Sequence, residues 1–164
     1  IDMWPPAEGA GGVEGLARAS RKAIEAGYVF SLHDNYQDIY PDSPSYDEKL
    51  VMKHPDGSVH LGGVWDGGLC RLVCSSQAMD LADPVIKNVK DHTAVNSYYL
   101  DTTTSAPMYE CYDEDHPMVR ADDRANKRAI LDKLAAQGWV VGAEAGVIGP
   151  CPLLPSLKEC PVRL

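Results

Sequence analysis

Three short apolar runs of this chain each lead into an acidic residue. They are Tyr28–Leu32 before His33 and Asp34, Ser97–Leu100 before Asp101, and Trp139–Ala143 before Glu144. Apolar runs of this length are typical of buried strands. Carboxylates at neighbouring strand ends can serve as a nucleophile and a general acid or base, so Asp101 and Glu144 are our candidate catalytic pair. An acid at a strand end is also a common helix cap or ion-pair partner, and the pattern alone leaves that alternative open.

Glycoside hydrolysis is the chemistry that best fits such a pair. In the retaining mechanism the two carboxyl groups lie about 5–5.5 Å apart, and adjacent strands lie about 4.8 Å apart. If Asp101 and Glu144 end neighbouring strands, their side chains converge at the retaining distance. We expect Asp101, among the hydroxyls of Thr102–Ser105, to stay ionised as the nucleophile. Glu144, between small apolar residues, is then expected to be the acid.

Helical patterns lie before each of these strands. Val13–Gly27 forms one, and a second starts at a cap on Ser75 or Ser76. A third has Asp122 and Asp123 in its first turn and ends at Gly138. Pro84 is expected to kink the second helix or to mark its true start. In the third, Asp123 and Lys127 are spaced for an i,i+4 pair.

The order of helix and strand repeats three times, which implies parallel strands joined by helical crossovers. Since barrel enzymes keep their catalytic groups at the carboxyl ends of such strands, we predict an α/β fold. It is a partial (β/α)8 TIM-type barrel of about three βα units. We assign 1–146 to this partial catalytic domain and 147–164 to an irregular tail rich in proline and cysteine.

The stretch from Asn35 to Gly68 is long, polar and full of turn signals, so we expect a functional lid or binding loop. Within it, Gly62–Gly68 places Trp65 among glycines. A tryptophan in such a setting is suited to be an aromatic platform that approaches a ligand closely, and Trp65 is our candidate substrate-binding aromatic residue.

Composition limits the possible partners. The 164 residues carry a net charge of −9, which argues against nucleic acid and against an anionic membrane surface. No apolar run approaches the roughly 18 residues of a transmembrane helix, and no signal peptide is visible, which favours a cytoplasmic location. The oligomeric state is not specified by the sequence.

Five cysteines without regular spacing do not suggest a disulfide framework. Cys70 and Cys74 could share a helical face, but the sequence offers no set of about four zinc ligands. Asp113, Asp115 and His116 could hold calcium, although a hydrogen-bonded loop is the favoured interpretation. We therefore expect buried or free thiols, no metal and no cofactor.

Several motifs resemble one enzyme group when they are taken together. They are His33–Asp38, Gly62–Trp65, Asp101–Thr104, Tyr109–Asp113 with His116–Met118, and Gly142–Gly146. The chain from about Gly15 to Gly146 resembles a bacterial glycoside hydrolase group related to the α-N-acetylgalactosaminidases of family 129 and the endo-acting enzymes of family 101.

The resemblance implies a retaining β/α-barrel enzyme acting on a carbohydrate, specifically on α-linked N-acetylgalactosaminide-like sugars. The family's nucleophile falls on Asp101 and its acid/base glutamate on Glu144. Its sugar-contacting histidine falls on His33 and its aromatic lid on Trp65. We add Asp34 to the substrate-binding set because it stands beside His33 at a strand mouth.

The chain also departs from the family pattern. A further substrate-binding aspartate on an earlier strand and the later barrel strands have no counterpart here, and the tail after Gly146 does not match. The isolated chain is therefore expected not to be active, and a non-catalytic sugar-binding remnant is the alternative. A doubly wound nucleotide-type domain is disfavoured, because no Gly-rich loop stands directly between a strand and a helix.

Overall fold

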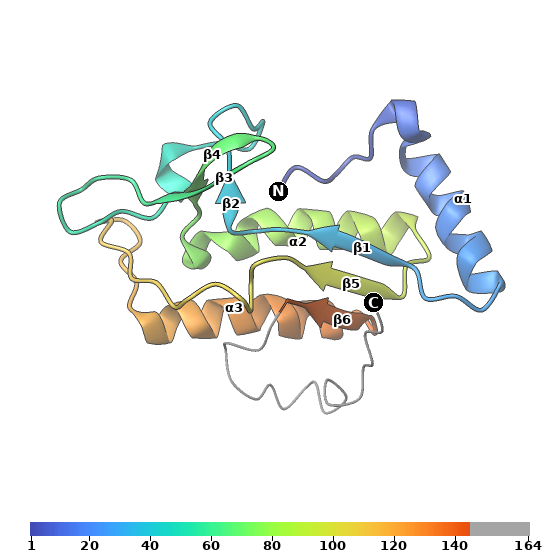
Figure 1. The fold of residues 1–164 in the computed structure, drawn as a ribbon. Coiled ribbons are helices and arrows are strands. Elements are labelled where there is room, and N and C mark those ends of the chain that lie inside the picture. Colours follow the sequence, from blue (N-terminus) through green and yellow to red (C-terminus); the bar gives the residue numbers. More distant parts are fainter. Residues whose placement is uncertain (145–164) are drawn as a thin grey trace.

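The computed structural model describes residues 1–144, which form an α/β fold with a parallel sheet backed by helices (Figure 1). The helices are α1 (Gly12–Glu25), α2 (Ser75–His92) and α3 (Arg120–Ala135), with short 3-10 turns at Glu8–Ala10 and Glu48–Leu50. The strands are β1 (Ser31–Asp34), β2 (Asp38–Ile39), β3 (Leu61–Trp65), β4 (Gly68–Leu72), β5 (Ser97–Leu100) and β6 (Val140–Ala143). The predicted tail, 147–164, and the domain boundary at 146 lie outside the described residues.

The main sheet has the order β1-β5-β6, and both of its strand pairs are parallel. This confirms the predicted alternation of helices with parallel strands. β1 begins three residues later than predicted, because Tyr28 takes part in the hydrogen bonds that end α1. The Tyr28 amide donates to the carbonyl of Ala23, and Gly27 takes a left-handed φ of 83°. These bonds terminate the helix and leave Tyr28 outside the sheet.

Helices α2 and α3 cover one face of this sheet, and Figure 1 looks onto the other face with these helices behind. Side chains alternate along a strand, so every second residue enters the core. The strand residues of this core are Tyr98, Leu100 and Val141; the helices contribute Ala78, Ala82, Ile86 and Val89 from α2 and Ile130, Leu131 and Leu134 from α3.

A second, antiparallel sheet of order β2-β4-β3 has short strands near both ends of the stretch predicted to be a long loop. The residues between β2 and β3 lie mostly outside strands, so a functional lid or binding loop over Asn35–Gly68 stays a prediction. The strands of this sheet are short and pair with residues distant in the sequence, such as Asp38 of β2 with Leu72 of β4. Pairing across the chain supplies the backbone hydrogen bonds that the local sequence does not suggest.

The two long helices differ in how well their ends were predicted. α2 begins at Ser75 after Cys74, and no side chain caps it, so the predicted serine cap is wrong. The helix continues through Pro84, which therefore does not mark its start. α3 agrees with the prediction: Asp123 and Lys127 form their ion pair at 3.0 Å. No helix within residues 1–144 is long and apolar enough to cross a membrane.

Candidate active site

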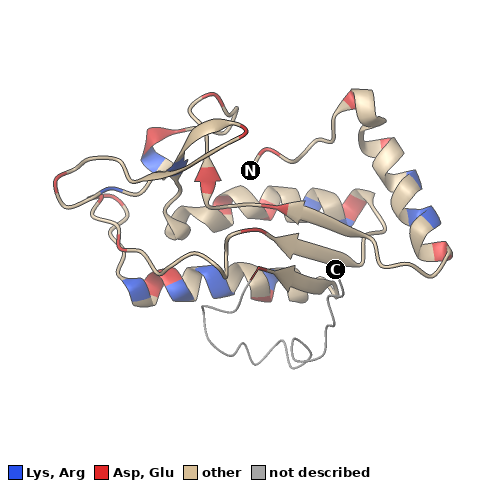
Figure 2. Ribbon diagram, in the orientation of Figure 1, with Lys and Arg blue, Asp and Glu red and all other residues tan. Residues whose placement is uncertain are grey.

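The carboxyl ends of β5 and β6 bring Asp101 and Glu144 to the same edge of the sheet. The register pairs Leu100 with Ala143, so the two acids are the next residues on neighbouring parallel strands. Figure 2 shows acidic residues at both strand ends. Alternation places both side chains on the face of the sheet that α2 and α3 leave open. The predicted pair therefore comes together at a strand mouth.

Asp101 has two polar neighbours at its carboxylate. The amide of Thr102 donates to Oδ1 at 3.0 Å, and His33 Nε2 lies 4.0 Å from Oδ2. The threonine hydroxyls bond elsewhere: Thr103 Oγ1 donates to the Asp101 carbonyl, and Thr102 Oγ1 donates to Asn35. We expected hydroxyl groups to surround the Asp101 carboxylate. Instead, a backbone amide and a histidine lie beside it.

Burial raises the pKa of Asp101 above its ordinary value, and the charge of Glu144 raises it further. His33 and the Thr102 amide act in the opposite direction. A carboxylate disfavours a second nearby negative charge, so this response indicates that Asp101 and Glu144 lie within electrostatic reach.

Glu144 is exposed at the end of β6 and is held by the loop after Asp101. Ser105 Oγ donates to Glu144 Oε2 at 2.9 Å, and Thr104 Oγ1 donates to the Glu144 carbonyl. The hydroxyl-rich stretch that follows Asp101 therefore positions the other acid. This is a role that sequence reasoning did not assign.

Tyr99 lies next to both acids and was missed as a site residue. Its ring stacks on His33 with centroids 5.3 Å apart, and burial, Glu144 and Asp101 all raise the pKa of its hydroxyl. A Cβ at Gly142 would stand 2.9 Å from the Tyr99 ring. Any residue larger than glycine at position 142 would therefore clash with the ring in its present position. Tyr99 and Asp101 are two residues apart on one strand, so their side chains lie on the same face. This spacing is the sequence signal that could have identified Tyr99.

Thr102 adopts a left-handed conformation with a φ of 59° directly after Asp101. For a β-branched residue this conformation is an outlier and costs about 1–3 kcal/mol. Outliers of this kind cluster at functional sites, where the surrounding structure holds them. Here the Thr102 amide points at the Asp101 carboxylate, so the strained turn serves the candidate nucleophile.

His33 and Asp34 are neighbours on β1 but face opposite ways. The His33 side chain is 60% exposed on the open face, near Asp101. Asp34 is 1% exposed, and its carboxylate accepts hydrogen bonds from the Tyr98 hydroxyl at 3.2 Å and from the Asn35 amide at 2.8 Å. In this arrangement Asp34 holds groups beneath the site, and a direct substrate contact stays a prediction.

Trp65 lies on β3, in the β3–β4 hairpin rather than in a glycine-rich loop. It is 60% exposed, and a Cβ at Gly63 would stand 2.6 Å from its ring, so the ring rests on its own strand. No hydrogen bond or ring stacking within residues 1–144 links Trp65 to His33 or to Asp101. The structure therefore groups His33 with the acids and leaves Trp65 on the neighbouring sheet.

Asn35 and Asp38 belong to the His33–Asp38 motif, but the sequence did not suggest a role for them. Asn35 accepts from Thr102 and donates to Asp38 at 3.0 Å, which ties the end of β1 to the end of β5. Asp38 also raises the pKa of Asp101 through its charge. Nothing in the local pattern distinguishes these residues from ordinary turn formers.

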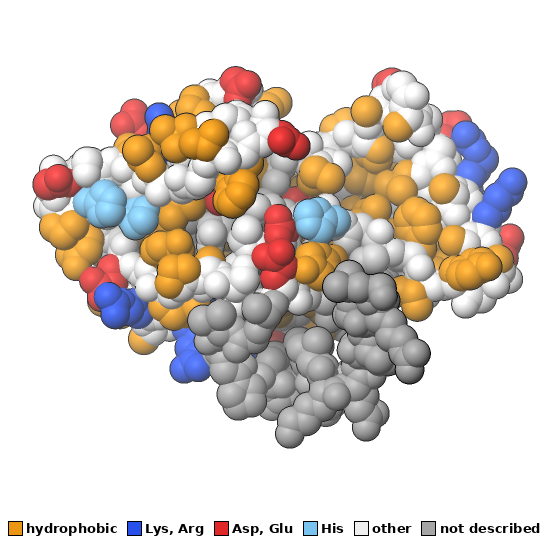
Figure 3. Space-filling view, viewed as in Figure 1, with side chains coloured by type: hydrophobic (Ala, Val, Ile, Leu, Met, Phe, Trp, Pro, Cys, Tyr) orange, Lys and Arg blue, Asp and Glu red, His pale blue; other side chains and the backbone are white. Residues whose placement is uncertain are grey.

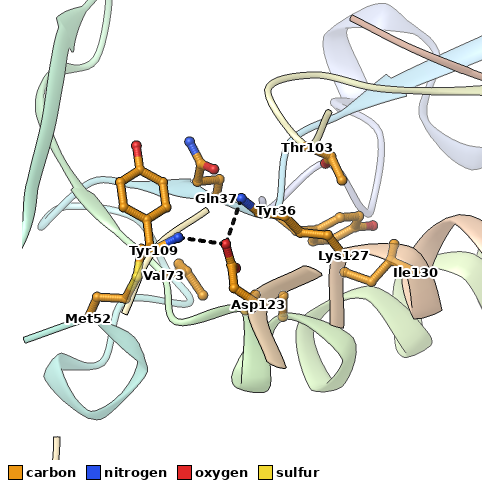
Figure 4. Close-up of a pocket in the computed structure, with 11 residues that line it drawn as sticks. Tyr36, Gln37, Met52, Val73, Thr103, Tyr109, Asp123, Lys127 and Ile130 are labelled. Atoms are coloured by element: carbon orange, nitrogen blue, oxygen red, sulfur yellow. Dashed lines mark hydrogen bonds and ion pairs between the residues drawn. The ribbon is translucent and has the colours of Figure 1, made fainter. Parts of the chain in front are cut away.

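The candidate site lies on the open face of the sheet, at the molecular surface. The space-filling view shows acidic side chains beside a histidine in the middle of this face (Figure 3). A separate enclosed pocket lies between the second sheet and α3, where Asp123 bonds the Tyr109 amide and Lys127 (Figure 4). It holds only about 20 Å³, room for about one water molecule, so a sugar does not fit there.

Comparison with known proteins gives a consistent result. Residues 15–149 match the family described as glycosyl hydrolases related to the GH101 family, GH129. The ligand-free α-N-acetylgalactosaminidase NagBb from Bifidobacterium bifidum is similar with a TM-score of 0.83 and 26% identity, over 87% of this chain and 24% of that one. Its Gal-NHAc-DNJ complex gives a TM-score of 0.85 and 25% identity, over 90% and 24% of the two chains.

A more distant likeness concerns the fold alone. The α-galactosidase TtGalA from Thermus thermophilus, in complex with stachyose, has a TM-score of 0.60 and 15% identity, over 84% of this chain and 29% of that one. The chain spans about a quarter of the length of the NagBb structures that it matches.

Proposed function

We propose, on the premise that this chain belongs to the GH129 family of glycosyl hydrolases, that it carries the two working carboxylates of a retaining glycosidase. The substrate class is an α-linked, N-acetylgalactosaminide-like sugar, since the similar NagBb structures are of an α-N-acetylgalactosaminidase. We further propose that the chain supplies about three βα units of a (β/α)8 barrel. The open face of its sheet would then be the barrel interior.

The observation that carries the proposal is the placement of Asp101 and Glu144. They follow paired residues on adjacent parallel strands, and adjacent strands lie about 4.8 Å apart. The retaining mechanism needs carboxyl groups about 5–5.5 Å apart, whereas an inverting pair needs about 6.5–9.5 Å to admit a water molecule. The strand geometry therefore favours retention.

In this mechanism Asp101 attacks the anomeric carbon while Glu144 gives its proton to the leaving oxygen. The glycosidic bond breaks, and an ester forms between the sugar and Asp101. Glu144 then takes a proton from water, whose oxygen attacks the anomeric carbon and releases Asp101. The Thr102 amide and His33 stabilise the negative charge of the resting nucleophile.

The remaining predicted residues act around this pair. His33 reaches the open face beside Asp101 and is placed to contact a sugar hydroxyl. Trp65 is the proposed aromatic contact from the second sheet. Asp34, assigned to substrate binding from the sequence, would act from beneath through Tyr98 and Asn35.

The test is hydrolysis of an aryl α-N-acetylgalactosaminide by the complete enzyme that contains this chain. Asp101→Gly should lower kcat by more than about 10³-fold, and Glu144→Ala by about 10²–10⁴-fold. Added azide should rescue both variants with opposite stereochemistry: a β-glycosyl azide from Asp101→Gly and an α-glycosyl azide from Glu144→Ala. Asp42→Asn, at an exposed loop position, is the control and should keep full activity.

The alternative is a carbohydrate-binding remnant without turnover. A remnant would bind sugar equally well after both acids are changed to amides, and it would show no azide product. Loss of activity without azide rescue in either variant would remove the assignment of the two roles.

A further inference from the structure

A cluster of soft metal-ligand side chains lies in a separate buried region of the chain. Cys74, Cys111 and His116 bring two thiols and a ring nitrogen within 4.8 Å of one another, and all three residues are buried. Cys74 directly precedes α2, whereas Cys111 and His116 belong to the segment between β5 and α3. The sequence showed no set of ligands with zinc spacing, because Cys74 is far from Cys111 and His116 along the chain.

Backbone pairing builds this cluster. Cys111 and Met118 exchange two backbone hydrogen bonds, at 2.8 and 2.9 Å, which fold the intervening loop and return His116 to Cys111. On the other side, the Cys74 amide donates to the Leu50 carbonyl at 2.8 Å. The three side chains therefore stand on backbone that is fixed by hydrogen bonds on both sides.

The distances agree with a tetrahedral metal site. Zinc bonds sulfur at about 2.3 Å and histidine nitrogen at about 2.0–2.1 Å, which at tetrahedral angles separates two sulfurs by about 3.8 Å and a sulfur from a nitrogen by about 3.5 Å. Cys111 Sγ lies 3.5 Å from His116 Nδ1, and Cys74 Sγ lies 3.8 Å from Met118 Sδ. The Met118 thioether lies beside Cys74 at the edge of the cluster, where it also accepts from the Ser75 hydroxyl at 3.1 Å.

The imidazole of His116 faces a carboxylate at a distance longer than a hydrogen bond. Its Nε2 lies 3.7 Å from Asp113 Oδ1, while its Nδ1 faces the thiol. Asp113 is itself held by Lys53 at 2.7 Å and by the amide of Asp115 at 2.9 Å. A carboxylate on this side of a metal-ligating histidine orients the ring once the two groups come within hydrogen-bond distance.

Simple core packing explains this cluster less well. Cys70 shows what a packing thiol looks like: it is fully buried on β4 and lies outside the cluster. His116 Nε2, in contrast, is buried without a hydrogen bond among the described residues, and such a group is costly in an apolar core.

We propose that Cys74, Cys111 and His116 bind one thiophilic d10 metal ion, Zn²⁺ or Cu⁺, with the Met118 thioether as a weaker fourth ligand. Two thiolates neutralise Zn²⁺, which suits a buried site, and a thioether suits Cu⁺. All four donors come from the protein, as in a structural site. The ion would tie the start of α2 to the loop that precedes α3.

The test loads the full reduced chain with Zn²⁺ in one arm and with Cu⁺ under anaerobic conditions in the other. After desalting, we expect one equivalent of metal in at least one arm, and the arm that retains it identifies the ion. Cys74→Ser, Cys111→Ser and His116→Asn should each lose most of this metal. Cys70→Ser is the matched control, since it removes a buried thiol outside the cluster, and it should keep the metal.

Two further measurements keep the proposal decidable if a serine variant fails to fold. In the unmodified chain, bound metal should protect Cys74 and Cys111, but not Cys70, from alkylation measured by mass spectrometry. Co²⁺ should give thiolate charge-transfer absorption, which Met118→Leu should shift because it removes a ligand and keeps the volume.

Three results would overturn the proposal. The first is that neither arm retains metal. The second is that Cys151→Ser/Cys160→Ser loses the metal while the cluster variants keep it. The third is that the chain forms a Cys74–Cys111 disulfide and the reduced form binds no ion.

Discussion

The two faces of the β1-β5-β6 sheet have different tasks, and the neighbouring tyrosines of β5 show the contrast. Tyr98 enters the core under α2 and α3 and donates its hydroxyl to the buried Asp34. Tyr99 points to the open face, where it stacks on His33 and lies close to both candidate catalytic acids. One step along the strand thus separates a residue that stabilises the fold from a residue that serves the site.

This contrast shows that residues important for stability and residues of the candidate site lie on opposite faces of the same sheet. Parallel sheets are normally covered on both faces, yet here one face keeps exposed residues such as Val140 and His33. Apolar packing on the covered face can therefore hold the strands while the open face accommodates charges, a strained turn and glycine. Substitutions on the two faces should separate these two tasks.

The largest effect is expected from truncating a core residue of the covered face. Leu100 is 0% exposed, so Leu100→Ala should lower the free energy of unfolding by about 2–5 kcal/mol through lost burial and a cavity. Val140 is 65% exposed on the open face, and Val140→Ala should change it by less than about 0.5 kcal/mol. Urea unfolding followed by circular dichroism measures both. Equal losses would mean that the open face is also packed.

An intermediate effect is expected from the two tyrosines. Tyr98→Phe removes the hydroxyl that donates to Asp34 and should cost about 1–3 kcal/mol of unfolding free energy, because a buried carboxylate loses a partner. Tyr99→Phe keeps the ring that stacks on His33 and should stay within about 0.5 kcal/mol. The same urea titrations decide the matter, and a reversed order would contradict the assignment of the faces.

The smallest effect concerns Asp101 and depends on pH. Because the folded chain raises the pKa of Asp101, it binds that proton more tightly than the unfolded chain does. The resulting stability is present below the ordinary carboxyl pKa of about 3.9 and is lost as the pH rises through the folded value. Asp101→Asn should therefore unfold at a higher urea concentration than the unchanged chain at pH 7, and the gain should shrink towards pH 4.

Asp42→Asn provides the control for this pH test, because it removes one negative charge at an exposed position. It accounts for the general benefit of lowering the net charge of −9. A gain for Asp101→Asn that equals the control, or that grows as the pH falls, would show that burial does not disfavour the charged form of Asp101.

Prediction from sequence succeeded where local pattern decides structure. The positions of β5, α3 and β6 and the Asp123–Lys127 pair followed from apolar periodicity and i,i+4 spacing. Asp101 and Glu144 were found because each follows a buried strand directly. β1 was displaced because the hydrogen bonds that end α1 use Tyr28, which its apolar character had assigned to the strand.

Prediction failed where residues distant in sequence supply the partners. The second sheet depends on pairings such as Asp38 with Leu72, so its strands resemble a loop when they are considered alone. Tyr99 and Ser105 gained their roles only when β6 was placed beside β5.

The sequence by itself determined which segments are helices and strands of the main sheet and which acids stand at the strand ends, because both depend on neighbours within a few residues. Only the tertiary structure decided that His33, Tyr99 and the two acids share one face. It also brought Cys74, Cys111 and His116 into one buried cluster. The physical reason is that strand pairing and backbone hydrogen bonds between distant segments set these contacts, and no local period encodes them.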